Sequence, residues 1–233
     1  MGGAAAAEEA AAVSPVTIAV FAALALFGWL LRRDGLAVKA DQLRQVQAVL
    51  PLLDGPSIVP QPRDYPHVTG RYRGREVRIE PHTDSISVRK LPALWLQVSL
   101  RDELPVPATL DVMMRPRNVE YWSPFDQLAH ELERPAGWPA DANLRTDKAE
   151  GASDVRRLIE PHLGFLRDPR GKEILITPRG VRVTLLAAEG ERGAYLLQRQ
   201  AQFSGAPLDP TLVRGLLDRC VAMADAAKER GWT

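Results

Sequence analysis

The 233-residue sequence lacks several features that would assign a protein to a class at once. It contains one cysteine, Cys220, so no disulfide can form within the chain and a disulfide-stabilised fold is excluded. Its formal net charge is +1, which gives no indication of the strongly basic face typical of nucleic-acid binding. With 45% apolar and 25% charged residues, the composition also excludes a collagen-like fibre and an acidic disordered chain. We therefore expect a folded protein with no nucleic-acid partner.

Recognised catalytic motifs are missing as well. The sequence has no Gly-x-Ser-x-Gly elbow, no phosphate-binding Gly-x-x-x-x-Gly-Lys-Ser/Thr loop and no Gly-x-Gly-x-x-Gly fingerprint. No cysteine pair and no His-Glu-x-x-His pattern supplies metal ligands at a familiar spacing. We therefore expect no catalytic residue, no cofactor and no metal site, and a protein that is not an enzyme is favoured.

Charge is absent from one long segment near the start of the chain. No Asp, Glu, Lys or Arg occurs from Ala10 to Leu31, and all 30 basic residues follow that segment. A helix of this length rises roughly 33 Å, enough to cross a hydrocarbon core of about 30 Å. The sequence predicts a transmembrane helix over residues 14–31, in contact with the lipid bilayer, after a short tail at residues 1–13.

Basic residues lie on one side of this segment, which predicts its orientation. None precedes it, and four lie just after it: Arg32, Arg33, Lys39 and Arg44. The positive-inside rule then places the N-terminus outside and the C-terminal part in the cytoplasm. We expect the membrane that holds the anchor to be the inner membrane of the cell. A cleaved signal peptide would begin with a basic region, whereas Glu8 and Glu9 precede this run. We expect an uncleaved, single-pass anchor.

A juxtamembrane helix is predicted over residues 34–53, ahead of a soluble domain over residues 58–230. Three leucines recur at seven-residue spacing: Leu36, Leu43 and Leu50. Pro51 ends the pattern after about two heptads, too few for a convincing coiled coil. Packing of this helix on its own domain is favoured, and self-association stays open. We interpret the stretch around Gly55-Pro56 as a linker.

The first half of the soluble domain shows the alternation of strands. Two strand-like runs flank Arg73-Gly74, which we interpret as the turn of a hairpin. Runs at 94–100 and 109–114 follow, and the four strands could form an antiparallel meander. A short helix is expected after Ser123, and then a loop without clear periodicity from Glu133 to Ser153.

The sequence pattern in the second half of the soluble domain predicts a helix from Ser153, three strands (EILIT, GVRVTLL and AYLLQRQ) and a last helix from Asp209-Pro210. Cys220 lies on the apolar stripe of that last helix, which indicates a core residue rather than a nucleophile. We predict an α+β fold: an N-terminal transmembrane helix, then a soluble domain of mainly antiparallel sheet with flanking helices. That domain is either one body or two units, 58–133 and 153–230, joined by the long loop.

The histidines do not form a recognised catalytic pattern. His82 and Asp84 are close in sequence, but catalytic triads are gathered from distant positions, so a polar turn is favoured. His130 and Glu131 are interpreted as a solvated helix face rather than a metal site. The main alternative to a non-enzymatic protein is an anchored hydrolase with a cleft between the two units, lined by His82, Asp84 or His130.

The densest group of basic residues surrounds the predicted hairpin. Together with the residues after the anchor, it supplies the candidates for contact with anionic lipid: Arg32, Arg33, Arg71, Arg73 and Arg75. Each basic residue close to a membrane contributes about 1 kcal/mol of attraction. Because Glu76 and Glu80 lie beside this group, ordinary surface arginines are favoured. An anionic-lipid binding module is kept as a further alternative.

Three aromatic residues are the candidates for contact with a protein partner: Tyr121, Trp122 and Trp138. Aromatic side chains are enriched among interface anchors, and loops often present them. Trp138, between Gly137 and Pro139 in the long loop, is the strongest of the three. Packing of the short helix is the competing explanation for Trp122.

Three segments of the soluble part carry a resemblance to known sequences: TGRYRGREVRIEP, SVRKLPALWLQVSL and KEILITPRGVRVTLL. They resemble a family of bacterial single-pass membrane proteins without an assigned activity. The resemblance covers most of the chain after residue 60 and implies no activity, cofactor or catalytic residue. The sequence thus favours a membrane-anchored accessory, assembly or scaffold protein for a membrane protein or complex, of respiratory or photosynthetic type among others, with a protein partner in the membrane.

Overall fold

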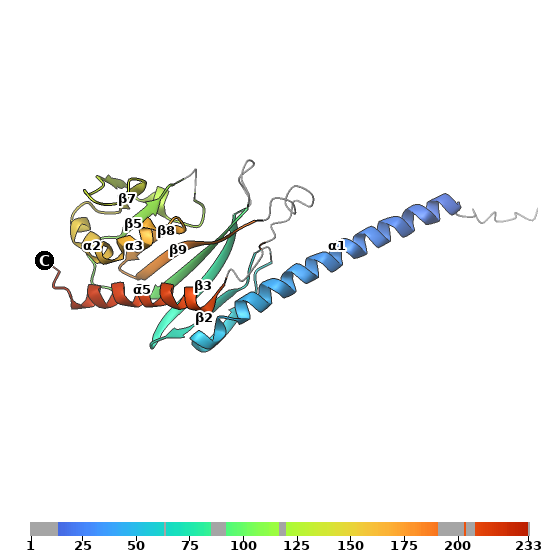
Figure 1. The fold of residues 1–233 in the computed structure, drawn as a ribbon, viewed down its shortest axis with the longest axis horizontal. Helices are drawn as coiled ribbons and strands as arrows, with labels where there is room; N and C mark the ends of the chain where they lie inside the picture. The colour runs from blue at the N-terminus through green and yellow to red at the C-terminus, as the bar shows by residue number, and fades with distance from the viewer. Residues whose placement is uncertain are drawn as a thin grey trace, which may run out of the picture. The chain divides into compact units, whose positions relative to one another are not determined.

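The structure is a computed structural model that describes residues 14–62, 64–84, 92–116, 120–190, 203 and 208–232. It confirms the α+β fold class: a long N-terminal helix is followed by an antiparallel sheet with flanking helices (Figure 1). The chain divides into two compact units, residues 1–41 and 42–233. The tail at 1–13 and the predicted strand AYLLQRQ lie outside the described residues.

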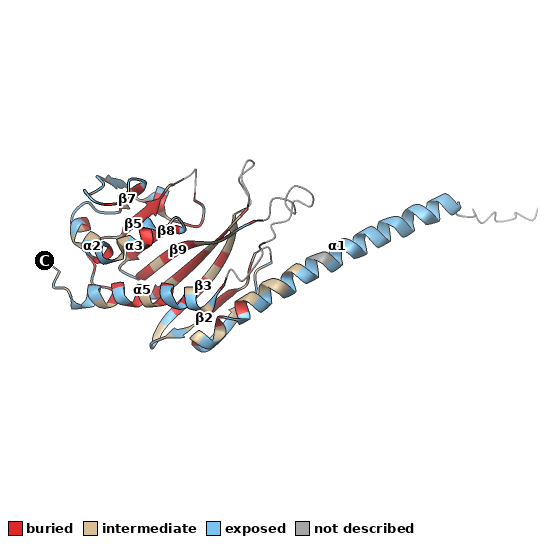
Figure 2. Cartoon of the chain, viewed as in Figure 1, coloured by how far each residue is buried: buried red, intermediate tan, exposed pale blue. Residues whose placement is uncertain are grey.

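Helix α1 spans Pro15–Gln47, so the predicted transmembrane and juxtamembrane helices form one continuous element. Its first half is apolar and exposed (pale blue in Figure 2). Among the residues that the structure describes, one helix is long and apolar enough to cross a membrane, and it lies within Pro15–Leu52. The end of this helix differs, because Val46 in its last turn and Val49 just after it are fully buried in the core of the second unit.

Nine strands form one sheet within the described ranges, in the order β1-β2-β3-β4-β9-β8-β5-β7-β6, and every neighbouring pair is antiparallel. Their bounds are β1 Asp54–Val59, β2 His67–Tyr72, β3 Arg75–Asp84, β4 Ala93–Arg101, β5 Leu110–Met114, β6 His130–Leu132, β7 Ala142–Thr146, β8 Gly171–Thr177 and β9 Gly180–Glu189. Strands β9 and β8, from the second half of the sequence, lie between β4 and β5 of the first half. This interleaving joins 58–133 and 153–230 into one sheet rather than two units with a cleft between them.

Helices cover one face of this sheet. They are α2 Ala152–Ile159, α3 Leu163–Arg167 and α5 Pro210–Glu229, with short 3-10 turns η1 Leu50–Leu52, η2 Phe125–Gln127 and η3 Glu160–His162. Helix α5 packs on β4 and β9, while α2 and α3 reach β5 and β8 (Figure 1). Asp209 caps α5 by accepting a hydrogen bond from the Thr211 N–H, and Pro210 occupies its first turn, as expected.

The predicted hairpin is confirmed, with its turn at Arg73-Gly74. Strands β2 and β3 pair from Tyr72–Arg75 back to Val68–Ile79. The two turn residues both have positive φ, 49° at Arg73 and 78° at Gly74. This is the turn geometry that matches the twist of the flanking strands.

Several local predictions were wrong. The presumed linker at Gly55-Pro56 is the edge strand β1, and the presumed loop at 133–153 contains β7. The helix expected after Ser123 is a single 3-10 turn, and His130 belongs to strand β6. Hydrogen bonding to a neighbouring strand determined these segments, and their own periodicity does not reveal it. The meander also stops after β4, because β9 takes the place expected for β5.

Candidate functional site: the polar face of the sheet

The two faces of the sheet differ because side chains alternate along each strand. One face supplies the apolar core beneath the helices, with Leu94, Leu96 and Val98 of β4 fully buried. The other face, which we call the polar face, carries His, Glu, Arg, Gln and Asp side chains from successive strands. The segment after β5 covers part of it with Trp122 and Phe125, which form a small cluster with Met113 and Trp95.

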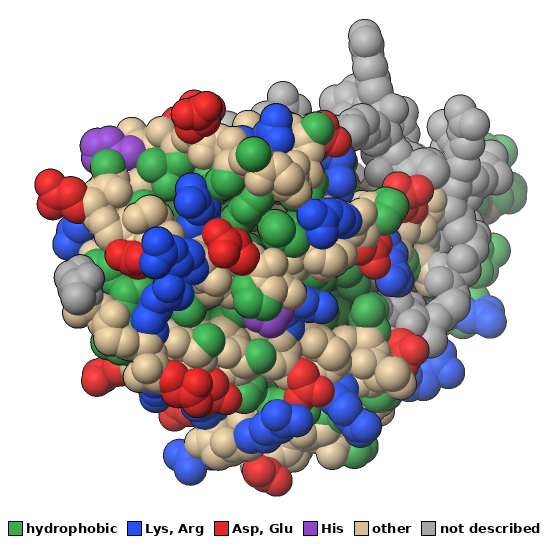
Figure 3. All heavy atoms as spheres, turned by 60° about the vertical axis from the view of Figure 1, so that its left-hand side comes forward, with side chains coloured by type: hydrophobic (Ala, Val, Ile, Leu, Met, Phe, Trp, Pro, Cys, Tyr) green, Lys and Arg blue, Asp and Glu red, His purple; other side chains and the backbone are tan. Residues whose placement is uncertain are grey.

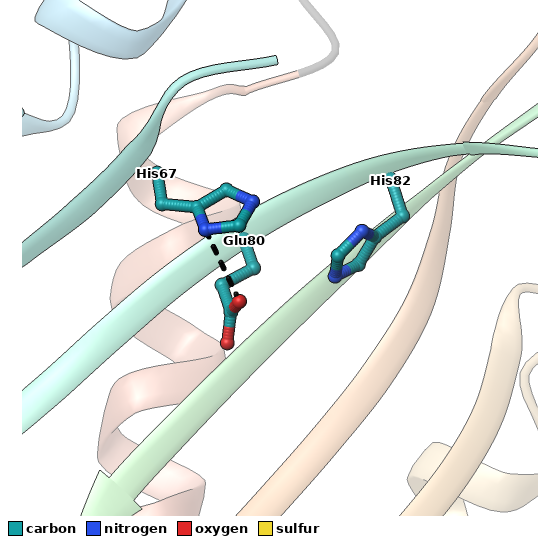
Figure 4. A group of neighbouring side chains, drawn as sticks. All are labelled: His67, Glu80 and His82. Carbon is teal, nitrogen blue, oxygen red and sulfur yellow. Dashed lines mark ion pairs between the residues drawn. The ribbon is translucent and has the colours of Figure 1, made fainter. Parts of the chain in front are cut away.

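A histidine cluster lies on the polar face where β2 and β3 pair. It contains His67, Arg78, Glu80 and His82, and Figure 4 shows the rings of both histidines with Glu80 between them. His67 Nδ1 lies 3.3 Å from Glu80 Oε1. The ligand atoms of the two histidines and Glu80 all lie within 4.8 Å of one another.

The Arg78 guanidinium joins two members of this cluster. Its Nη2 donates to His67 Nδ1 at 2.7 Å and to Glu80 Oε1 at 3.0 Å. Burial lowers the pKa of His67, and the Arg78 charge lowers it further, while Glu80 opposes the change. His67 is therefore neutral at pH 7, and its Nδ1 accepts the hydrogen bond. Two acceptor atoms thus lie 3.3 Å apart and are held together by a cationic nitrogen.

Asp64 holds His82 from the other side. Its carboxylate lies 3.5 Å from His82 Nδ1 and accepts hydrogen bonds from the N–H groups of Tyr65 (2.8 Å) and Thr83 (3.1 Å). Burial alone would raise the pKa of Asp64, but these hydrogen bonds and His82 lower it overall. Asp64 is therefore an ionised carboxylate that orients the His82 ring.

A second group, the buried acid cluster, lies further along the polar face. It contains Asp111, Ser123, Glu173, Arg182 and Thr184, and both acids are fully buried. Arg182 donates to Glu173 through Nε at 3.1 Å and Nη2 at 3.0 Å, and the Thr184 hydroxyl adds a bond of 2.7 Å. Ser123 Oγ bonds Glu173 and lies 3.2 Å from Asp111 Oδ2.

The two buried acids differ in protonation state. Burial raises the pKa of Asp111 well above its ordinary value, and the neighbouring Glu173 raises it further. Asp111 is therefore held protonated beside Glu173, whose charge Arg182 balances. This arrangement resembles other pairs of carboxyl groups that share a proton because they cannot both ionise.

A hollow of about 390 Å³ adjoins the histidine cluster on the polar face. Arginines from three neighbouring strands line it: Arg71, Arg78 and Arg101. Thr69 and Glu76 complete its polar lining, with Gly55 from the edge strand. Arg78 thus lies between the hollow and the histidine cluster.

The aromatic candidates are placed differently from one another. Trp138 is 7% exposed and belongs to the main core, and Trp122 is 8% exposed and packs on the polar face. This corrects the expectation that Trp138 is displayed on a loop: the indole is buried in the main core, and β7 within the same segment joins the sheet. Tyr121 is 53% exposed and alone of the three offers an accessible ring. Contact of any of them with a partner stays a prediction.

The lipid candidates near the hairpin have protein partners. Arg73 pairs with Asp218 of α5 at 2.8 Å, and Arg75 pairs with Asp225 and, at 3.3 Å, with Asp102. These pairs tie the hairpin to α5 and balance its charge. Arg32, Arg33 and Arg71 are exposed. On the face seen in Figure 3, acidic and basic side chains are interspersed without a patch of one sign.

The residues suggested for a hydrolase site are not gathered in one place. His82 lies on β3 and His130 on β6, with five strands between them in the sheet. At about 4.8 Å per strand, this separates them by roughly 29 Å. Cys220 is fully buried against the sheet, which raises the pKa of its thiol to about 12 and confirms its core position.

Comparison with known proteins assigns no family. No protein-family model matches the sequence, and no curated protein matches it at a significant level. Among solved structures, the mycobacterial trehalose monomycolate transport factor A, TtfA, matches with a TM-score of 0.31 and 10% identity over 70% of this chain and 69% of that one. A TM-score this low does not establish a common fold, and we transfer no function from it. Membership in a bacterial single-pass membrane family stays an expectation.

Sequence reasoning missed the histidine cluster, although a signal was present. The pairing of β2 with β3 sets Val68 opposite Ile79, so the next pair outward is His67 and Glu80. Glu80 and His82 are two residues apart on one strand and therefore share a face. A two-residue turn at Arg73-Gly74 sets this register, so the turn and the positions of His67, Glu80 and His82 together are the sequence signal for the cluster.

Proposed function

We propose that this protein is a single-pass membrane protein, anchored through residues 14–31, whose domain at 58–230 lies in the cytoplasm. There it would serve as an accessory, assembly or scaffold component of a membrane protein or complex. The observation that carries the proposal is the exposed apolar surface of α1, followed in the chain by a folded α+β domain.

The first half of α1 has the surface of a lipid-facing helix. The large apolar side chains that the structure describes in this half are exposed: Val16, Ile18, Val20, Phe21, Leu24, Leu26, Phe27, Trp29 and Leu30. A continuous apolar surface of this kind is rare on a soluble monomer and favours a bilayer or a partner. The Arg33 guanidinium lies 5.6 Å from the Trp29 ring, a pairing suited to the membrane interface.

Charge placed within the span tests the anchor. An arginine at the centre of a transmembrane helix costs about 2.5–3.5 kcal/mol of insertion free energy. We expect the wild-type chain to stay in the membrane pellet after carbonate extraction and the double variant Ala22→Arg/Leu24→Arg to be released. The matched control is Leu36→Arg, which changes an exposed leucine of α1 beyond the predicted span. Release of the wild-type chain by carbonate would contradict the anchor.

Labelling of introduced cysteines tests the orientation. Cys220 is buried, so the native thiol gives little background in the folded protein. We expect Lys148→Cys, at an exposed position of the domain, to react with a membrane-impermeant maleimide only after cell lysis. The matched control, Ala6→Cys, should react in intact cells. Labelling of Lys148→Cys in intact cells would reverse the proposed topology.

Tyr121 is the starting point for a test of the accessory role. A photo-crosslinking amino acid at position 121 is expected to form a discrete adduct with one membrane protein after gentle solubilisation. The control position is Glu229, exposed at the end of α5. If the chain purifies as a lone monomer and position 121 yields no adduct, the accessory role is wrong even where the anchor is confirmed.

A further inference from the structure

We propose that His67, Glu80 and His82 bind one divalent transition-metal ion of the zinc type, which takes the place now filled by the Arg78 guanidinium. This site goes beyond the proposed membrane role and does not depend on it. Two imidazoles and one carboxylate are a donor set that zinc uses when a further coordination position is left to water or another ligand.

The distances on the polar face fit such an ion. In a tetrahedral site with ligands about 2.0–2.1 Å from zinc, two ligand atoms lie roughly 3.3–3.4 Å apart. His67 Nδ1 and Glu80 Oε1 are separated by 3.3 Å. The ligand atoms of all three residues lie within 4.8 Å of one another, so no two of them have to approach by more than about 1.5 Å to reach tetrahedral spacing (Figure 4).

Asp64 supplies the support that a ligating histidine usually has. Metal-binding histidines commonly give their second ring N–H to a carboxylate, which fixes the ring and its tautomer. Asp64 Oδ2 lies 3.5 Å from His82 Nδ1, and two backbone N–H groups hold that carboxylate in place. Nε2 of His82 is then the nitrogen left to face His67 and Glu80.

Arg78 marks the position of the cation. Its Nη2 contacts both His67 Nδ1 and Glu80 Oε1, the two atoms at tetrahedral spacing. Arginine cannot lose its charge in a protein, so the guanidinium and a metal ion exclude each other there. The hollow that Arg78 also lines gives the displaced side chain a place within reach. Metal binding and the position of Arg78 are therefore coupled.

The bound ion would join the start of β2 to the far end of β3. His67 begins β2, whereas Glu80 and His82 lie in the second half of β3. An ion that binds the folded state and not the unfolded chain stabilises the fold by mass action. We expect zinc to raise the melting temperature of the wild-type protein.

The test is a zinc titration of the full chain in detergent, purified without a histidine tag and freed of metal with a chelator. Competition with a chromophoric chelator gives stoichiometry and affinity, and Co²⁺ in place of zinc reports tetrahedral geometry by its visible absorption. One equivalent per chain is expected. Glu80→Gln and His82→Gln should lose that equivalent, while the control His130→Gln, an exposed histidine on β6, should keep it.

Two further variants separate this site from chance zinc binding. Asp64→Asn is expected to weaken zinc binding by about 10–100-fold, because it removes the support of a ligand. Arg78→Gln should bind zinc about tenfold more tightly or better, because it removes a competing positive charge. Zinc should raise the melting temperature of Arg78→Gln but not of Glu80→Gln, and circular dichroism checks that each variant is folded.

Three results would overturn the proposal. The first is less than a tenth of an equivalent bound by the wild-type and Arg78→Gln proteins. The second is equal binding by wild-type, Glu80→Gln and His82→Gln proteins. The third is an Arg78→Gln variant that binds no more tightly than wild type, since the ion would then not occupy the place of the guanidinium.

Discussion

On the polar face, two equally buried carboxyl groups, those of Glu173 and Asp111, differ in protonation state because their hydrogen-bond partners differ. Glu173 receives bonds from Arg182 and Thr184, so its negative charge is balanced. Asp111, equally buried, has one bond to Ser123 and an Oδ1 atom with no partner. Burial therefore keeps the proton on Asp111, whereas a group of cationic and hydroxyl donors holds the charge on its neighbour.

The raised pKa of Asp111 predicts a pH dependence of stability. The folded state holds this proton more tightly than the unfolded chain does. Stability from this group is therefore complete below the unfolded pKa, near about 3.9, and is lost as pH rises towards the raised value. Asp111→Asn mimics the protonated acid, so its free energy of unfolding relative to wild type should rise by up to about 1.4 kcal/mol per pH unit in this range.

Urea denaturation of both proteins at pH 5 and pH 8 measures this difference. The matched control is Asp126→Asn, which changes an exposed aspartate of η2. Stability curves that run parallel for wild type and Asp111→Asn across this range would contradict the assignment of a buried, protonated carboxyl.

The positions of the strands depend on turns that can be predicted from the sequence and on close backbone contacts between strands that cannot. Gly74 has φ 78° in the β2–β3 turn, with no atom near the position of a Cβ. Gly180 opens β9 with φ 138°, and a Cβ there would lie 2.0 Å from the carbonyl oxygen of Leu100. Both glycines are required by the backbone conformation, but only the second is also required by a neighbouring strand.

This contrast predicts two different costs for the same substitution. Gly74→Ala places a side chain in the left-handed region and should destabilise the fold by about 1–2 kcal/mol. Gly180→Ala adds a clash with the backbone of β4, so a loss above about 4 kcal/mol or failure to fold is expected. Thermal unfolding of the two variants checks the order, and equal losses would mean that β4 and β9 are not in this contact.

At the scale of the whole molecule, the boundary between anchor and domain lies inside a helix. The second compact unit begins at Gln42, and Val46 and Val49 near the end of α1 are fully buried in its core. Burial of a valine side chain contributes about 1.5–3 kcal/mol. The last turn of α1 therefore belongs to the domain, although it is continuous with the predicted anchor.

Two truncations test this boundary. A chain that begins at Gln42 keeps both valines and should be monomeric, soluble without detergent and cooperatively folded. A chain that begins at Leu50 loses them and should melt at a clearly lower temperature, as followed by circular dichroism. Equal melting temperatures would show that the last turn of α1 does not contribute to the core.

The sequence by itself determined the elements whose signals are local. The uncharged run predicts the first half of α1, the Arg73-Gly74 turn predicts the β2–β3 hairpin, and Asp209-Pro210 predicts the start of α5, because charge, turn geometry and capping act within a few residues. Tertiary structure alone decided that β9 inserts beside β4, that Trp138 is buried, and that His67 and Glu80 meet Arg78 as one site. These outcomes depend on strand pairing and side-chain packing between segments that are distant in the sequence. The free energy of these contacts is distributed over the whole sheet, so no single segment predicts them.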